Sequence, residues 1–289
     1  MVVSEIAVIS GKGGTGKTTV AAALIALSED TVMADCDVDA PDLHILLKPD
    51  VKRKSDFSSS KVAEIDPEIC IECGLCEDKC RFGAAHPPEI DPIACEGCGV
   101  CKLICPEKAI SMRDRVSGYL YESETRFGPM AHARLLAGEG NSGKLVTEVR
   151  NLGVSLAERN KSNMVLIDGS PGIGCPVIAT VTGIQLSVIV TEPTLSGIHD
   201  MNRVIELLQR FNVPGLVIIN KYDLSMENTK KIEKFCRQNG VDVIARIPFN
   251  PIMTRSMVAL QTMPEHAPNH EITGILREAH QEIVKKIEK

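Results

Sequence analysis

The chain has 289 residues, 44% of them hydrophobic and 24% charged, enough for the core of one large α/β domain or of two smaller units. Its 38 Asp and Glu outnumber 32 Lys and Arg, so the net charge of −6 offers no basic surface for nucleic acid. No apolar run reaches the roughly 18–20 residues that a membrane helix needs, and Met1–Glu5 does not resemble a signal-peptide start. We therefore expect a cytoplasmic protein with no nucleic-acid partner and no stable membrane binding.

Short apolar runs rich in β-branched residues alternate with stretches of helical spacing toward both ends of the chain. The predicted strands are Glu5–Ser10, Thr31–Asp35, Met164–Asp168, Ser187–Thr191 and Leu216–Asn220. The predicted helices are Thr18–Ser28, Ile198–Phe211 and Thr229–Asn239. This alternation predicts an α/β fold with a doubly wound, mostly parallel sheet.

The first predicted strand ends in a glycine-rich loop that precedes the first predicted helix. The loop satisfies Gly-x4-Gly-Lys-Thr in the strand–loop–helix order of a phosphate-binding loop. Its members are Gly11, Lys12, Gly13, Gly14, Thr15, Gly16, Lys17, Thr18 and Thr19. Glycines let backbone N–H groups close around phosphate oxygens, and the helix N-terminus adds positive potential. We expect Lys17 to reach the β- and γ-phosphates and Thr18 to bind Mg²⁺.

A second lysine, Lys12, sets this loop apart from an ordinary phosphate-binding loop. The sequence Lys-Gly-Gly-x-Gly-Lys-Thr-Thr resembles the deviant Walker A family, which includes the MinD and ParA partition ATPases, Mrp-type cluster carriers and the nitrogenase iron protein. The resemblance implies an ATP-dependent homodimer in which Lys12 reaches the partner's phosphates and neutralises charge in the transition state. The alternative is that Lys12 is a solvated loop lysine.

Acidic residues after two predicted strands carry the same resemblance. Asp35-Cys36-Asp37 ends the second strand, where the family keeps its switch I acids. The resemblance implies that Asp37 orients or activates the attacking water and that Asp35 supports Mg²⁺ or the loop. Asp168 ends a Walker B-like strand and is followed by a switch II-like Gly-Ser-Pro-Gly, so it is expected to hold Mg²⁺ through water.

Two later segments resemble the loops that surround the nucleotide base. Asn220-Lys221-x-Asp223 follows a predicted strand, and the resemblance implies that Asn220 contacts the purine edge and that Asp223 belongs to the same base-reading loop. The tetrad also resembles the guanine-reading motif of GTPases, so by itself it leaves the base open; ATP is usual in the family. Pro248, in Ile247-Pro248-Phe249, matches the loop beside the base, although a strand-ending turn is the alternative.

Eight of the eleven cysteines lie between Cys70 and Cys105. The block Asp-Pro-x-x-Cys-x2-Cys-x2-Cys-x3-Cys occurs twice, which predicts a pseudo-two-fold module. Residues 65–110 resemble bacterial two-cluster ferredoxins, with Arg81 departing from the usual proline. By that resemblance one [4Fe–4S] cluster is held by Cys70, Cys73, Cys76 and Cys105, and the other by Cys80, Cys95, Cys98 and Cys101. Zinc and disulfides are the alternatives, but zinc sites usually pair two Cys-x-x-Cys arms over a longer gap.

The cysteine-rich segment interrupts the α/β pattern and is acidic, with five Lys and Arg against ten Asp and Glu over Lys61–Ser111. The polar, Ser-rich stretch 51–61 before it is interpreted as a linker. We predict an ATPase domain in two parts, residues 1–60 and 112–289, with a small α+β ferredoxin-like domain inserted at 61–111. Residues 112–160 carry no clear motif; Asn141-Ser142-Gly143-Lys144 is either a second phosphate-contacting loop or an ordinary turn.

Three isolated cysteines and the C-terminus complete the analysis. Cys236 is expected to be a buried core thiol, whereas Cys36 and Cys175 flank the nucleotide motifs, and a redox or cluster role for Cys175 stays open. Apolar residues between Ile272 and Ile287 recur at helical spacing, which favours docking onto the core over membrane binding.

The order of the motifs suggests how the two modules work together. The insert follows switch I and precedes switch II, so nucleotide state is expected to bias the ferredoxin module. The first hypothesis is an ATPase that gates a two-[4Fe–4S] electron-transfer module for a redox partner enzyme. The second is an ATP-dependent carrier that delivers iron–sulfur or other metalloclusters to an apo-metalloprotein client. The third is a partition or positioning ATPase. A shared fold does not distinguish these three hypotheses, because one fold can support different functions.

Overall fold

The computed structural model describes residues 3–140 and 142–288. The chain divides into two compact units: the first takes in Met1–Ser55, Leu120–Leu135 and Ser142–Lys289, and the second Asp56–Tyr119 and Leu136–Asn141. The predicted insert 61–111 lies within the second unit. That unit extends further on both sides and also includes the separate segment 136–141.

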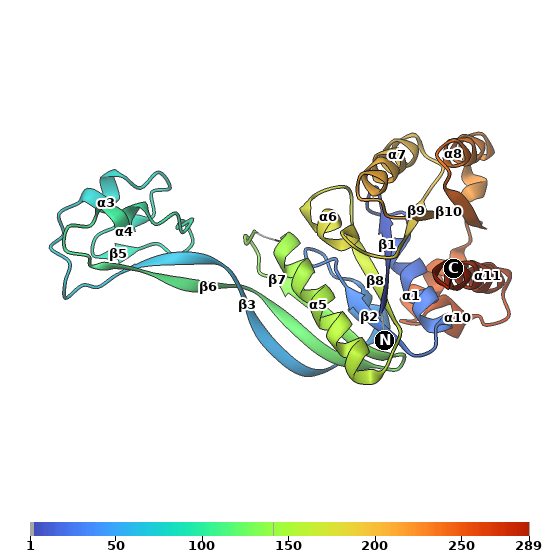
Figure 1. The fold of residues 1–289 in the computed structure, drawn as a ribbon, viewed down its shortest axis with the longest axis horizontal. Coiled ribbons are helices and arrows are strands. Elements are labelled where there is room, and N and C mark those ends of the chain that lie inside the picture. Colours follow the sequence, from blue (N-terminus) through green and yellow to red (C-terminus); the bar gives the residue numbers. More distant parts are fainter. Residues whose placement is uncertain (1–2, 141, 289) are drawn as a thin grey trace. The chain divides into compact units, whose positions relative to one another are not determined.

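A nine-stranded sheet runs through the described residues (Figure 1). The strands with parallel neighbours are, in spatial order, β11 (Asp242–Ile247), β10 (Gly215–Asn220), β9 (Leu186–Thr191), β1 (Ser4–Ser10), β8 (Met164–Pro171), β2 (Thr31–Asp35) and β7 (Gly128–Leu135). Two long strands, β6 (Ile110–Thr125) and β3 (Asp50–Ile65), complete the order and carry the chain between the two units. The predicted α/β fold with a mostly parallel sheet is confirmed.

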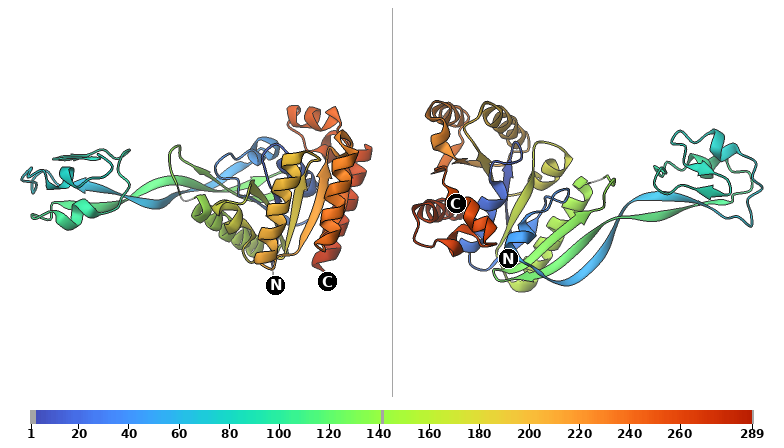
Figure 2. Two further views of the ribbon diagram at one scale, coloured as in Figure 1. Left: turned by 90° about the horizontal axis from the view of Figure 1, so that it is seen from above. Right: turned by 180° about the vertical axis from the view of Figure 1, so that it is seen from behind.

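Helices cover both faces of the sheet in the first unit, as Figures 1 and 2 show. They are α1 (Lys17–Leu27), α2 (Leu43–Leu47), α5 (Ser142–Asn160), α6 (Cys175–Val181), α7 (Leu195–Arg210), α8 (Met226–Gln238), α9 (Pro251–Val258), α10 (Met263–His266) and α11 (Glu271–Ile287), with a 3₁₀ turn at Tyr222–Leu224. Alternate residues of a strand face opposite sides. Ile6 and Val8 of β1 accordingly pack in one core cluster with α1 and α11. On the other face, a Cβ at Gly153 of α5 would lie 3.3 Å from Val165 Cγ1, so the glycine permits close packing.

The polar stretch 51–61 is not a linker, and this expectation was wrong. It lies within β3, which runs without interruption from Asp50 to Ile65. Residues 50–56 of this strand are exposed, while Phe57, Ala63 and Ile65 are buried. Because β3 is an edge strand, charged residues there are tolerated and hinder pairing with other chains. The polar composition of residues 51–61 therefore resembles that of a linker, although the segment is a strand.

The segment without a clear motif forms regular structure. The turn Arg126-Phe127 joins β6 to β7, and a connection of two residues requires these strands to be antiparallel. Asn141 lies outside the described residues. Ser142, Gly143 and Lys144 begin α5, so the expected loop or turn is wrong for these three residues.

Between β3 and β6, the second unit has only short helices and strands, and its core is small. Its short elements are α3 (Leu75–Asp78), β4 (Ala85–His86), β5 (Glu89–Ile90) and α4 (Val100–Ile104). Gly74 and Gly99 precede α3 and α4 with φ of 78° and 75°, so the two repeats share a left-handed turn that favours glycine. The buried core comprises Ala63, Ile65, Cys76, Ala85 and Ile110. Partly buried side chains pack against this core: Cys70, Cys80, Ile90, Cys95, Cys101, Cys105 and Met112.

The C-terminal helix α11 docks onto the core, as expected, through Ile272, Leu276, Ala279 and Ile283. Cys236 is fully buried in α8, which confirms its interpretation as a core thiol. Over residues 3–140 and 142–288, none of the helices combines the length and apolarity needed to cross a bilayer.

Candidate functional site

The phosphate-binding loop lies where sequence predicts it, between the end of β1 and the start of α1. It borders a cleft of about 450 Å³, within the size range of small-molecule sites. The lining residues are Ser10, Gly13, Gly14, Gly16, Lys17, Thr18, Thr19, Asp37, Ala40, Asp42, Pro171, Asn220, Lys221, Met253, Thr254 and Met257. The first unit therefore brings the predicted loop, one switch I acid and the base-loop asparagine to a single cleft.

Two carboxylates, those of Asp168 and Asp37, lie against Lys17 at the first residue of α1. Its Nζ donates to Asp168 Oδ1 at 2.6 Å and lies 3.6 Å from Asp37 Oδ2. Asp35 and Asp168 are register partners on adjacent parallel strands, so they lie side by side, with Asp35 at the end of β2 and β8 running on to Pro171. Burial alone would lower the pKa of Lys17, but the charge and hydrogen bond of Asp168, together with the charges of Asp37 and Asp35, raise it. Burial raises the pKa of Asp37 to about 6, although Lys17 opposes the rise.

Two buried oxygens in this cluster fit a divalent cation. Asp35 Oδ2 and Asp168 Oδ2 have no hydrogen-bond partner among the described residues. Burial, with the nearby Asp168 charge, raises the pKa of Asp35 well above its usual value. Carboxylate and hydroxyl oxygens with phosphate are the ligands that Mg²⁺ prefers. Asp35, Asp168 and the cleft residue Thr18 therefore fit a Mg²⁺ ion, held directly or through water.

Asn220 binds the phosphate-binding loop in this structure. Its Nδ2 donates to Thr15 O at 2.7 Å, and its Oδ1 accepts from the Lys221 N–H. A Cβ at Gly16, where φ is +89°, would lie 2.4 Å from Asn220 Nδ2, so glycine is required there. The expected contact of Asn220 with a purine edge stays a prediction.

Asp223 and the loop after β11 are also close together. Asp223 Oδ1 accepts the N–H of Phe249 at 2.6 Å, so the residue after Pro248 is fastened to the Asn220-Lys221-x-Asp223 segment. The structure therefore joins the two segments that sequence analysis assigned to the base. The role of Pro248 beside a base stays a prediction.

Lys12 lies against side chains of its own chain that sequence analysis missed. Its Nζ is 2.7 Å from Glu192 Oε1, and it donates to Thr194 Oγ1 at 3.3 Å and to Ser196 Oγ at 3.1 Å. Glu192 also pairs with Lys221 at 2.9 Å. The available signal was positional: Glu192 directly follows the buried strand β9, and carboxyl ends of parallel strands share one edge of the sheet.

The eight clustered cysteines line two small cavities of the second unit. Cys70, Cys73, Cys76 and Cys105 line one, and Cys80, Cys95, Cys98 and Cys101 line the other. Each cavity thus receives three thiols from one repeat and the fourth from the other repeat.

The donor sets fit iron–sulfur clusters. Within the described residues, no three His, Cys, Asp or Glu side chains converge closely enough to hold a single metal ion. A [4Fe–4S] cluster differs from a single ion because each of its four irons takes a separate cysteine, so the thiols surround a cavity. Backbone N–H groups also approach three of the sulfurs, at 3.3–3.5 Å for Cys70, Cys80 and Cys95. Burial alone would raise the pKa of the Cys80 thiol, but hydrogen bonds from the backbone N–H groups of residues 82–85 hold this pKa below its usual value.

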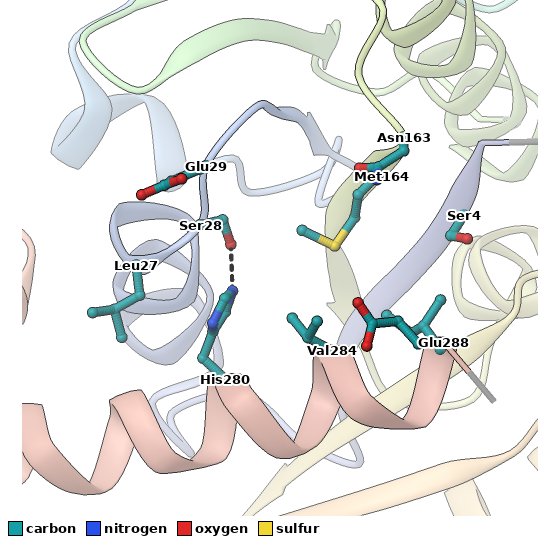
Figure 3. A pocket seen from close by; sticks show the side chains of 10 residues that line it. Ser4, Leu27, Ser28, Glu29, Asn163, Met164, His280, Val284 and Glu288 are labelled. Carbon is teal, nitrogen blue, oxygen red and sulfur yellow. Dashed lines mark hydrogen bonds between the residues drawn. The ribbon is translucent and has the colours of Figure 1, made fainter. Parts of the chain in front are cut away.

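Other features of the first unit lie outside the predicted site. Cys175 is exposed at the first residue of α6, and Cys36 is buried. A second cavity of about 460 Å³ lies between the end of α1, the start of β8 and α11 (Figure 3). Its Ser28 and His280 are paired at 2.8 Å, and no predicted site residue lines it.

Residues 6–258 match the family model of the CobQ/CobB/MinD/ParA nucleotide binding domain. Among curated proteins, the uncharacterized protein MJ0578 of Methanocaldococcus jannaschii is 40% identical over 230 residues, which is 78% of this chain and 81% of that protein. The uncharacterized protein MJ0579 of the same organism is 27% identical over 232 residues, covering 76% of this chain and 81% of that protein.

Solved structures of similar fold include the septum site-determining protein MinD of Pyrococcus horikoshii complexed with Mg-ADP. Its TM-score is 0.61 at 18% identity, over 98% of this chain and 97% of that chain. An ATP complex of Cyanothece McdA has a TM-score of 0.58 at 14% identity, over 99% of this chain and 96% of that chain. At these identities the likeness shows a shared fold.

Proposed function

Because this chain belongs to the CobQ/CobB/MinD/ParA nucleotide-binding family, we propose that it is an ATPase whose nucleotide state gates a two-[4Fe–4S] electron-transfer module. The observation that carries the proposal is the presence, in one chain, of a phosphate-loop cleft and of two cavities with four thiols each. Neither a positioning ATPase nor a simple ferredoxin needs both.

The cleft supplies the groups that ATP hydrolysis requires. Loop N–H groups and Lys17 bind the phosphates, while Thr18, Asp35 and Asp168 hold Mg²⁺, which neutralises phosphate charge. Asp37 orients a water molecule for attack on the γ-phosphorus. The bond to the β–γ bridging oxygen breaks, ADP leaves, and the proton of the water passes to the released phosphate. In the ATP-dependent homodimer, Lys12 from the partner stabilises the charge that develops in this step.

The thiol cavities favour permanent clusters. The second unit buries few apolar side chains, and a core this small usually needs a metal or disulfides for stability. When bound, each [4Fe–4S] cluster stores one electron at low potential. With both clusters bound, the module would accept electrons from a low-potential one-electron donor and would pass them to an oxidised partner enzyme. N–H groups at the sulfurs of Cys70, Cys80 and Cys95 support the reduced form.

Backbone contacts support the coupling between nucleotide and clusters. Val38, next to Asp37, accepts the N–H of Leu135 at 3.2 Å within the first unit. The adjacent residue, Leu136, donates its N–H to Ser117 within the second unit. A displacement of switch I would therefore pass through one peptide bond into the second unit.

The segment that receives this displacement is itself tied to a cysteine repeat within the second unit. Arg115 Nη2 lies 2.5 Å from Glu139 Oε1, and Nη1 donates to Pro92 O at 2.8 Å. Pro92 lies three residues before Cys95.

The second candidate function is the cluster carrier, and the exposed thiol of Cys175, shortly after switch II, favours it. Two copies of Cys175 in a dimer could share one cluster, which would then be the cargo that the protein delivers.

The deciding experiment follows iron and sulfide in anaerobically purified protein during MgATP turnover with excess apo-ferredoxin. Electron gating predicts that about eight irons stay bound, since two clusters hold four each, and that reoxidation of the reduced protein by an electron acceptor differs between ATP and ADP. Iron that leaves in an ATP-dependent manner and appears in the apo-ferredoxin would establish the carrier. A protein that purifies without iron yet hydrolyses ATP would refute both cluster functions and leave the positioning ATPase.

A further inference from the structure

Glu192 is a buried carboxylate that pairs with Lys12 of the phosphate-binding loop and with Lys221 of the cleft lining. Its relative exposure is 9%, and its oxygens pair separately with Lys12 at 2.7 Å and Lys221 at 2.9 Å. Burial alone would raise the pKa of Glu192, but the hydrogen bonds from both lysines lower it. The residue is therefore an anion with two cations, one at each of its oxygens.

Backbone hydrogen bonds define the turn that leads from Glu192 into α7. The N–H of Thr194 donates to Glu192 O at 2.8 Å, and Thr194 Oγ1 caps the helix by accepting the N–H of Gly197. A Cβ at Gly197 would lie 2.4 Å from Glu192 O, so the turn has no room for a side chain at position 197. This turn fixes the position from which the carboxylate reaches Lys12.

Lys12 is surrounded by acceptors of its own chain. Besides Glu192, the hydroxyls of Thr194 and Ser196 accept hydrogen bonds from its Nζ. In the proposed homodimer, this same ammonium must reach the phosphates of the partner. It cannot serve both sets of acceptors, so dimerisation requires Lys12 to leave Glu192.

Lys221 provides Glu192 with a second ion-pair partner, so the buried carboxylate stays paired when Lys12 moves away. A buried charge that loses its only partner is strongly destabilising. Lys221 keeps Glu192 paired after Lys12 leaves, and it also donates to Gly14 O in the phosphate-binding loop at 3.2 Å. The arrangement therefore permits two positions of Lys12 without stranding a buried anion.

We infer that Glu192 is a positioning residue that retains Lys12 within its own subunit and so sets the threshold for ATP-dependent dimerisation. This inference rests on the proposed dimeric ATPase. Two lysines must be released per dimer, one from each subunit, so the effect of Glu192 on the dimer dissociation constant enters twice. Loss of a charge-assisted hydrogen bond typically changes an equilibrium by about tenfold or more.

The test compares full-length Glu192→Gln with the unaltered chain, using Mg²⁺ and a non-hydrolysable ATP analogue. We expect sedimentation equilibrium to show a dimer dissociation constant lowered at least tenfold. Half-maximal ATPase activity should likewise occur at lower protein concentration. Glu233→Gln removes the same charge from an ion pair with Arg246 and should change neither quantity. An unchanged or weaker Glu192→Gln dimer would overturn the inference.

Two further variants separate this inference from the proposed function. Lys12→Ala should abolish analogue-dependent dimerisation; if it dimerises normally, the proposed role of Lys12 in the dimer fails. If Lys12→Ala cannot dimerise but Glu192→Gln matches the unaltered chain, the retaining role of Glu192 fails alone. Ser196→Ala removes one weaker acceptor of Lys12 and should shift the dimer constant in the same direction by a smaller factor, which keeps the test decisive if Glu192→Gln does not fold.

Discussion

Replacement of Asn220 by alanine distinguishes two roles for this residue. The structure uses its amide to support the phosphate-binding loop, through the 2.7 Å hydrogen bond to Thr15 O. Asn220 is 6% exposed, so the change leaves a buried carbonyl without its donor. Such a loss costs about 1–3 kcal/mol. If the cost falls on the loop conformation that binds phosphate, affinity drops between about fivefold and 150-fold.

The assay is calorimetric titration of Asn220→Ala with ATP, GTP and inorganic tripolyphosphate, each with Mg²⁺. A loop-supporting role predicts the same loss for all three ligands, because they share the phosphates and differ in the base. Asn239→Ala is the matched control, since Asn239 Nδ2 donates to a backbone carbonyl within the α8 region at 2.9 Å, outside the cleft lining. Weakened ATP binding with unchanged tripolyphosphate binding would refute our reasoning and assign the amide to the base.

Three other predictions concern the clusters, pH and the loop backbone. Iron chelation should abolish hydrogen-exchange protection in the second unit, whose core is small, while the first unit stays protected. Burial lowers the pKa of His132 from 6.5 to about 4, so the native state keeps a neutral ring while the unfolded chain binds a proton. The free energy of unfolding should therefore fall by about 3 kcal/mol between pH 6.5 and pH 4, and His132→Gln should remove this part of the decrease in urea titrations. Gly11→Ala should weaken ATP binding by about fivefold to 150-fold, because its Cβ would lie 2.5 Å from the Asp200 backbone.

Each of these predictions has an outcome that contradicts it. Equal loss of protection in both units on chelation would mean that the core of the first unit depends on the clusters. An identical pH dependence for His132→Gln and the unaltered chain would place the acid sensitivity elsewhere. Gly274→Ala is the control for Gly11→Ala because nothing lies within 4 Å of its Cβ, so equal effects of the two variants would remove the steric explanation.

The amino-acid sequence alone determined the features of this protein that are built from residues close to one another along the chain. The glycine loop between a strand and a helix needs only neighbouring residues, because backbone N–H groups bind phosphate. Cysteines three positions apart likewise fold around one cavity, and their repetition predicted two such groups. Periodicity also predicted the buried strands, as at Thr31–Asp35, whose bounds match β2 in the structure.

The tertiary structure decided what depends on residues distant in sequence. Lys12 meets Glu192, 180 positions later, only because β1 and β9 are parallel neighbours in the sheet. Asn220 meets Thr15 across the same edge. The polar segment before the cysteines becomes a strand because it pairs at the edge of a sheet, which its composition does not reveal. Sequence spacing specifies contacts within a turn, whereas strand order specifies which loop ends share an edge, and that order is a property of the whole fold.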